Sequence, residues 1–265
     1  MNNIMLITHP DDSSMFMSTG RILRAYLIEA KYAFVSMLRI PVLPITMMAL
    51  PVLLYILFSA TVVGKLGAEN PNVAVSFFSG FLIFAVTGPG LFGFGIGLAV
   101  ERQSGILNLK RAQPMPPASC LIAKMITSVV STVFTMAFLI PAALTIGHLH
   151  LTIGQIANLV LISMFGVLPF CAIGFFIGTL VSGTASIGIV NLIFFPMLYL
   201  SGMFIPLPEI LEPWARIWPT FHINQIIRNT LGVESQIDIW ICVLILLGIT
   251  AVFTYLAARR FSRKG

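Results

Sequence analysis

The sequence predicts an all-α integral membrane protein with six transmembrane helices. Of its 265 residues, 58% are hydrophobic and only 9% are charged, whereas soluble proteins carry about 25% charged residues. The hydrophobic residues also gather in runs of about 20, the length that crosses a hydrocarbon core of about 30 Å. None of these runs contains Asp, Glu, Lys or Arg. These observations exclude a soluble enzyme, and they attribute the net charge of +6 to membrane-flanking residues rather than to a nucleic-acid surface.

The first region, residues 1–40, is expected to form a loose tail followed by an amphipathic helix. On a helical wheel one broad arc is apolar, and the opposite arc carries Arg21, Arg24 and Lys31. A helix of this kind, placed directly before a membrane span, is expected to lie in the cytoplasmic interface of the membrane. An ordinary helix that only anchors the first span is the alternative.

Six apolar runs then define a membrane domain at residues 41–257, and a basic tail follows at 258–265. Prolines inside several runs are compatible with membrane helices, because neighbouring helices and local adjustments satisfy the freed carbonyl groups. GxxxG pairs beginning at Gly93 and Gly174 offer surfaces where helices approach closely, within one subunit or between two. The spans are expected at residues 41–63, 73–100, 125–146, 156–181, 186–206 and 239–257.

The basic residues set the expected orientation. Twelve of the fifteen Lys and Arg residues flank the spans on one side if both termini lie on that side. Because cytoplasmic loops carry an excess of Lys and Arg, both termini and the loop between the second and third spans are expected inside.

That loop, residues 101–124, is the longest polar interruption of the apolar runs. It reads ERQSGILNLKRAQPMPPASCLIAK and begins with an acid–base pair, Glu101 and Arg102. A cytoplasmic loop of this composition is where a partner protein would bind. The alternative for the pair is a solvated ion pair beside the membrane, which contributes about 0–1 kcal/mol to stability.

The segment from Gly202 to Asp238 is unusual for a loop, because prolines separate short pieces rich in apolar and aromatic residues. Trp214 and Trp218 are four residues apart, so they would share one face of a helix, and Trp favours the membrane interface. We expect one or two short helices that dip into the outer leaflet.

The chain lacks the residue patterns of an enzyme. There is no GxxxxGK[ST] phosphate loop and no HExxH or GxSxG motif. Its three cysteines are far apart, and His148 and His150 lack acidic or cysteine neighbours, so no catalytic, cofactor or metal site is predicted. Ion-driven transporters normally keep ionisable groups inside the membrane. Their absence from these spans indicates that the driving force enters elsewhere.

Two stretches carry recognisable patterns. The first has an E-R-x-x-G pattern followed by leucines and prolines: Glu101, Arg102, Gly105, Leu107, Leu109, Pro114, Pro116 and Pro117. The second has an S-G-x-x-x-P pattern followed by a tryptophan, prolines and a histidine: Ser201, Gly202, Pro206, Pro213, Trp214, Pro219 and His222. In this order, together with the six spans and the leading helix, they resemble the ABC type-2 transporter permeases, the membrane subunits of bacterial ATP-binding-cassette exporters. The family's usual spacer residue between Pro213 and Trp214 is missing here.

The resemblance implies a function and a set of partners. The 101–117 loop would form a coupling helix that docks into a separate ATPase subunit, which binds ATP and Mg, and the leading helix would touch the same subunit. The 202–222 segment would form short re-entrant helices that close the outer end of the path. Two permease subunits would pair in the bacterial plasma (inner) membrane and export a drug, an antibiotic or a lipid-like substrate.

Other function classes make different demands on the sequence. An ion-coupled transporter or channel would be expected to show intramembrane ionisable groups or an internal repeat, and an intramembrane enzyme would need convergent polar residues within its spans. Neither pattern is present. A non-transporting membrane scaffold is compatible with the sequence. Measuring whether ATP hydrolysis is stimulated in the isolated complex would distinguish a scaffold from an exporter.

Overall fold

The computed structural model describes residues 19–39, 45–63, 71–111, 119–202 and 208–264, and it is helical without a β-strand in these ranges. The all-α prediction is therefore confirmed. Three of the predicted site residues, Pro114, Pro116 and Pro206, lie outside the described residues, as does the tail that was expected at residues 1–17.

The helices follow one another in an order close to the predicted one. The first is α1 (Thr19–Arg39), and the first apolar run forms α3 (Leu50–Phe58) between two wider π-helical turns, η2 (Ile45–Ala49) and η3 (Ser59–Val63). The second run is one long rod made of α5 (Pro71–Gly88), η4 (Pro89–Ile96) and α6 (Gly97–Gln103), followed by the short α7 (Ile106–Arg111). The remaining elements are α8 (Ser119–Thr145), α9 (Ile153–Leu180), α10 (Gly183–Tyr199), η5 (Glu209–Leu211), α11 (Glu212–Ala215), α12 (Pro219–Thr230) and α13 (Ile239–Lys264).

Within the described ranges, four helices are long and apolar enough to cross a membrane: Asn72–Gln103, Cys120–Thr145, Ile153–Leu180 and Ile239–Phe261. The other two predicted spans correspond to shorter apolar helices, Met47–Val63 and Gly183–Tyr199. The helix of the fifth run ends at Tyr199, whereas the span was expected to continue to residue 206. Gly202 has a φ of +73°, a left-handed conformation that commonly ends helices, which explains the earlier end.

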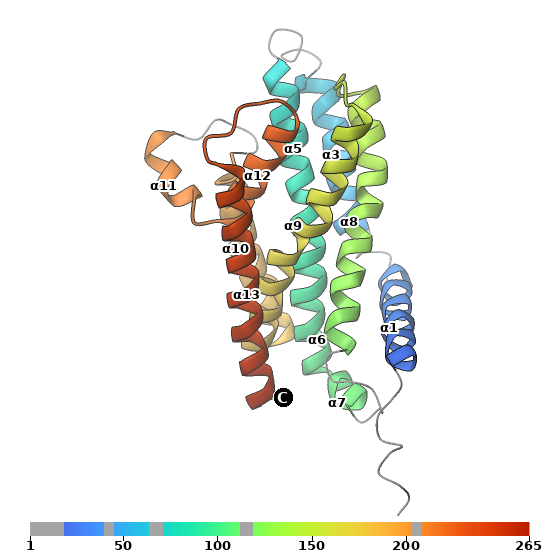
Figure 1. The fold of residues 1–265 in the computed structure, drawn as a ribbon. Helices are drawn as coiled ribbons and strands as arrows, with labels where there is room; N and C mark the ends of the chain where they lie inside the picture. Colours follow the sequence, from blue (N-terminus) through green and yellow to red (C-terminus); the bar gives the residue numbers. More distant parts are fainter. Residues whose placement is uncertain (1–18, 40–44, 64–70, 112–118, 203–207, 265) are drawn as a thin grey trace, which may run out of the picture.

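The helices form an elongated bundle in which α9 packs against η4, α8 and α13 (Figure 1). The short α7, the C-terminal end of α13 and the start of α1 lie at one end of the bundle, and α11 lies toward the other (Figure 1). We call the α7 end the inner end and the opposite end the outer end. The predicted basic loop and the two basic flanks therefore gather at the inner end.

Glycines allow α9 to approach the second rod closely. A Cβ added at Gly174 would lie 2.6 Å from the carbonyl oxygen of Gly90, and one at Gly178 would lie 2.9 Å from that of Gly95. The Gly174–Gly178 pair thus forms a close helix contact within one chain, which is one of the two arrangements expected from the sequence. Its partners on the second rod are Gly90 and Gly95 of the π-helical η4.

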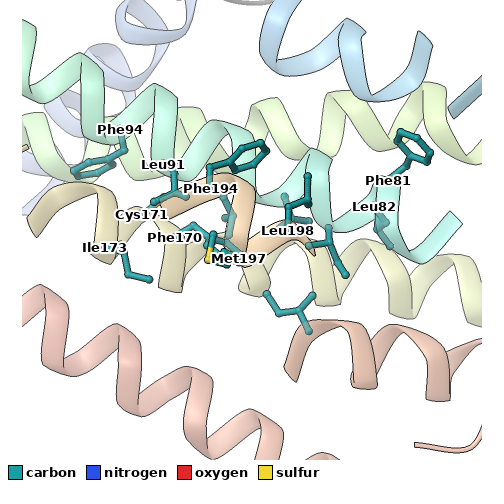
Figure 2. Packing of buried hydrophobic residues seen from close by; sticks show 14 of the residues in the cluster. Phe81, Leu82, Leu91, Phe94, Phe170, Cys171, Ile173, Phe194, Met197 and Leu198 are labelled. Carbon is teal, nitrogen blue, oxygen red and sulfur yellow. The ribbon is translucent and has the colours of Figure 1, made fainter. Parts of the chain in front are cut away.

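The centre of the bundle is packed with large apolar side chains. Figure 2 shows Phe170 and Cys171 of α9 lying against Leu91 of η4, with Phe194 and Met197 of α10 beside them. All five are at most 3% exposed. In a membrane such contacts stabilise through close packing more than through the removal of water, so the fit of these side chains fixes the positions of α9, α10 and the second rod.

Hydroxyl groups on α8 satisfy polar groups of the bundle interior. Ser128 donates to the carbonyl oxygen of Pro89 at 3.0 Å, where the proline ring and the wide turns of η4 interrupt the regular helix. The other buried hydroxyls of this row donate to carbonyls four residues earlier on α8: Thr127, Ser131, Thr132 and Thr135. The irregular η4 is therefore tied to a regular neighbour.

The helix α1 packs against α8 through part of its apolar arc. Ala30 is buried, and Met37 accepts a weak hydrogen bond from Ser131 of α8 at 3.8 Å. Leu27 and Leu38 of the same arc remain 58% and 45% exposed. One part of the apolar arc therefore contacts α8, and another part is exposed. On the opposite arc, Arg24 and Lys31 are exposed, and Arg21 lies in the first turns of the helix.

Candidate functional site

The inner end of the second rod carries the predicted acid–base pair. The carboxylate of Glu101 binds Lys124 of α8 at 2.9 Å, and the two side chains are 22% and 14% exposed. Glu101 therefore pairs with the next helix rather than with its neighbour Arg102. Because both groups are largely shielded from water, this is not the solvated surface pair that was the alternative, and removing one partner would leave a partly buried charge.

Arg102 binds the end of α9. Its guanidinium group donates to the carbonyl oxygen of Thr179 at 2.5 Å and to that of Val181 at 2.9 Å. The last turn of a helix has carbonyl groups without partners inside the helix, and a cation there also interacts favourably with the helix dipole. Arg260 of α13 reaches the same Thr179 carbonyl through Nε at 3.4 Å.

Gln103 joins the rod to a third helix. Its side-chain oxygen Oε1 accepts a hydrogen bond from the backbone N–H of Gly183 at 2.8 Å, at the first residue of α10. Three consecutive residues, Glu101, Arg102 and Gln103, thus bind α8, α9 and α10. We call these three residues the inner anchor.

Gly105 separates the inner anchor from α7. Its φ of +75° lies in the left-handed region, which glycine adopts without the steric cost that other residues meet. Beyond it, Leu107 is 5% exposed and packs into the bundle, whereas Leu109 is 70% exposed. The predicted helix therefore exists as α7 (Figure 1). Leu107 fastens it to the bundle, and Leu109 is exposed.

At the outer end, α12 is fastened to the end of α10. Thr220 donates to the carbonyl oxygen of Met197 at 2.8 Å, and Asn224 donates to that of Ser201 at 2.6 Å. The hydroxyl of Ser201 donates to the carbonyl of Leu198 at 2.6 Å. The predicted Ser201 and Gly202 therefore form a turn directly after α10. Backbone carbonyls at this end of α10 accept hydrogen bonds from side chains of α12.

The predicted His222 lies buried in the first turns of α12, with 1% of its surface exposed. Its Nε2 is 2.8 Å from the carbonyl oxygen of Arg216, so this nitrogen carries the proton and donates. Burial, which is the main cause, lowers the pKa of His222 below its ordinary value and keeps the ring neutral. The hydrogen bond thus joins two parts of the same segment, Arg216 and α12.

Trp214 and Trp218 were expected to share one face of a helix, but they do not. Trp214 lies in α11 and is 64% exposed, whereas Trp218 is partly buried and precedes α12 in an extended conformation. The predicted Pro219 opens α12 and is the cause, because a proline disfavours helical geometry in the residue before it. Short helices in this segment are nevertheless present, in agreement with the prediction.

Side chains suited to metal binding do not come together in the described part of the chain, where no three of His, Cys, Asp or Glu form a group. What the arrangement offers instead is mechanical. At one end of the bundle, the exposed α7 directly follows the inner anchor, which binds three helices. At the other end, the largely buried α12 is fixed to one of these helices, α10.

Comparison with known proteins identifies the family. The family model described as ABC-2 type transporter matches residues 24–231, which is most of the chain and includes the inner anchor, α7 and the outer segment. The chain belongs to this family. It is thus a multi-pass membrane protein of the ABC-2 permease type, as the two sequence patterns indicated.

One relative of this ABC-2 protein is a Bacillus subtilis (strain 168) protein named as a transport permease, YvfS. The two are 26% identical over 146 residues, which are 54% of this chain and 60% of the relative. The match therefore spans less than two thirds of the relative's length.

Several residues of these sites were not singled out from the sequence. Gln103 and Lys124 stand within the polar loop without a pattern of their own, and Thr220 and Asn224 stand beside His222. The partners of Arg102 are backbone carbonyls, for which no side-chain signal exists.

Proposed function

We propose that this ABC-2 chain is the membrane subunit of an exporter that is driven by ATP hydrolysed in a separate subunit. The observation that carries the proposal is the inner anchor: three adjacent side chains bind α8, α9 and α10, directly before an exposed short helix. Such an arrangement suits a lever between a partner and the bundle, and it has no evident use in an unpartnered chain.

In this proposal the ATPase binds α7 through its exposed side, which includes Leu109. Charged residues are depleted at the centre of protein interfaces, and an exposed apolar side chain such as Leu109 suits that position. When two ATPase subunits close on ATP, α7 moves with them. Because Glu101, Arg102 and Gln103 lie on a rigid helix end, the displacement reaches three long helices together rather than one.

The outer segment would then respond through α10. Gln103 holds the first residue of α10, Gly183, and Ser201 at its other end holds Asn224 of α12. Rigid helices that have two arrangements can carry such a movement between distant sites. We propose that α12, with Pro219 and His222, forms the outer gate, which opens when α10 moves away from the bundle.

The proposed cargo is hydrophobic or amphipathic, such as a drug, an antibiotic or a lipid-like compound. Its support is the lack of charged residues in the six apolar runs, because a charged cargo would be expected to need counter-charges along its path. A second copy or a related permease would complete the path. In this proposal the chain lies in a bacterial plasma membrane with its inner end and both termini facing the cytoplasm, which the excess of basic residues beside those segments supports.

A co-purification experiment tests the proposal. The tagged chain is co-expressed with its candidate ATPase and purified in detergent as wild type, as Leu109→Glu and as Ile153→Glu. Ile153 is an 87% exposed aliphatic residue at the opposite end of the bundle, so it is a matched control. We expect the ATPase to co-purify with wild type and Ile153→Glu, and to be lost with Leu109→Glu. An ATPase that binds none of them, or all three equally, contradicts the proposal.

A further inference from the structure

An apolar groove runs along the bundle between α10 and α13, and α9 forms its floor. Its volume is about 370 Å³, and every side chain that lines it is apolar. Ile173 and Val181 mark the two ends of the floor, Ile193 of α10 and Phe253 of α13 form opposite walls, and Trp218 lies at one end. The groove shares only Val181, whose carbonyl binds Arg102, with the inner anchor.

The groove occupies the inner half of the bundle. From Ile173 to Val181 the helix rises about 12 Å, which is close to the depth of a single leaflet, about half of a 30 Å hydrocarbon core. Because α9 runs from the outer to the inner end, Val181 is at the inner mouth. Trp218 and Pro219 close the other end, where the connection from α11 to α12 descends partway along the bundle (Figure 1).

Arginines surround the inner mouth. The carbonyl of Val181, the last residue of the floor, accepts from Arg102, and the carbonyl of Thr179 accepts from both Arg102 and Arg260. Arg259, the residue before Arg260 on α13, is exposed. A groove that is entirely apolar inside and cationic at its mouth matches a molecule with a long apolar chain and an anionic head.

We propose that this groove holds one acyl chain of an anionic phospholipid from the cytoplasmic leaflet, with its phosphate at Arg260. The depth fits one leaflet, the walls fit a hydrocarbon chain, and guanidinium groups bind phosphate oxygens in paired hydrogen bonds. The proposal rests on the membrane orientation given above and not on the export role.

Bound lipid is counted on the purified full chain by native mass spectrometry, after delipidation and addition of phosphatidylglycerol or phosphatidylcholine. Ile193→Trp fills the groove, and Leu192→Trp adds the same bulk to a neighbouring residue that is 74% exposed. We expect one retained phosphatidylglycerol per chain in wild type and in Leu192→Trp, and its loss in Ile193→Trp. Arg260→Gln should weaken the preference for phosphatidylglycerol by about fivefold, the effect of one cation near an anionic surface.

Trp218 provides a second readout, because it lines the closed end of the groove. In a chain carrying Trp214→Phe and Trp240→Phe, phospholipids brominated near the methyl end of the chain should quench Trp218 more than those brominated near the carbonyl. A wild-type chain that retains no phospholipid, equal retention in Ile193→Trp, or stronger quenching from the carbonyl end overturns the proposal. Lipid counting needs no ATPase, so its failure is distinct from a failed co-purification.

Discussion

The side-chain oxygen of Gln103 accepts a hydrogen bond from the backbone N–H of Gly183 at 2.8 Å, and this contact joins the end of α6 to the start of α10. The fit is tight, because a Cβ added at Gly183 would lie 2.8 Å from that oxygen and 3.0 Å from the Cα of Val100. A side chain at this position would separate the two helices. The contact is therefore as much a matter of shape as of hydrogen bonding.

Replacing Gly183 by alanine should destabilise the protein by about 1–3 kcal/mol, the usual cost of forcing extra volume into a packed contact. Gly188, one turn further along α10, faces open space with no atom within 4 Å of an added Cβ. Gly188→Ala should leave stability equal or slightly higher, because alanine favours helices. Thermal unfolding in detergent measures both, and equal behaviour of the two variants would contradict the close contact.

Removing the guanidinium group of Arg102 should leave the Val181 carbonyl without its donor and the Thr179 carbonyl with only the longer contact from Arg260. For Arg102→Gln we expect a loss of about 1–2 kcal/mol, below the full value for buried charged hydrogen bonds because the side chain is partly exposed. Arg102→Lys should recover only part, since a lysine does not reproduce the two-carbonyl fork. Arg24→Gln, an exposed change on α1, serves as control and should change stability by less than about 0.5 kcal/mol.

Gly105 should tolerate alanine poorly for a different reason. No atom lies within 4 Å of an added Cβ, so the cost is that of the left-handed backbone, about 1–2 kcal/mol. Gly154→Ala on α9 has the same open surroundings without a positive φ. If the two substitutions change the unfolding temperature equally, the backbone of Gly105 is not the cause.

His222 should make the stability depend on pH. Its pKa is lowered in the folded chain by burial, so between that value and the unfolded pKa of about 6.5 the unfolded chain binds more protons than the folded one. Stability is therefore complete above about pH 6.5 and falls as the pH is lowered. We expect His222→Gln to flatten this slope while His150→Gln, an exposed change, keeps it. Unfolding temperatures measured from pH 7.5 to 5 test this prediction. If they depend on pH in His222→Gln as they do in wild type, His222 is not the cause of the pH dependence.

The helices were predictable because their signals are local. Long apolar runs indicated the order of the main helices. The residues at which helices begin and end were less predictable where backbone geometry sets them. The helix α10 ends at Tyr199 because the turn through Gly202 follows, and Trp218 is extended because Pro219 comes next. Both effects are visible in the sequence only once the neighbouring structure is known.

The sites were predictable only in part. The polar loop indicated Glu101 and Arg102, but the sequence suggested that they pair with each other. Their actual partners, Lys124 and the carbonyl groups at the end of α9, depend on how α8 and α9 pack. The same holds for Asn224, whose partner is a backbone carbonyl on another helix.

The central claim is that the inner anchor transmits movement between an ATPase and the bundle. The most direct test measures ATP hydrolysis by the purified permease–ATPase complex in proteoliposomes, comparing wild type with Gln103→Ala and Ser104→Ala. Ser104 is the adjacent exposed residue, and its hydroxyl bonds only locally, to the carbonyl of Glu101. We expect all three to bind the ATPase equally, and only Gln103→Ala to lose the permease-dependent part of hydrolysis. Unchanged hydrolysis in Gln103→Ala, or an equal loss in Ser104→Ala, would contradict the claim.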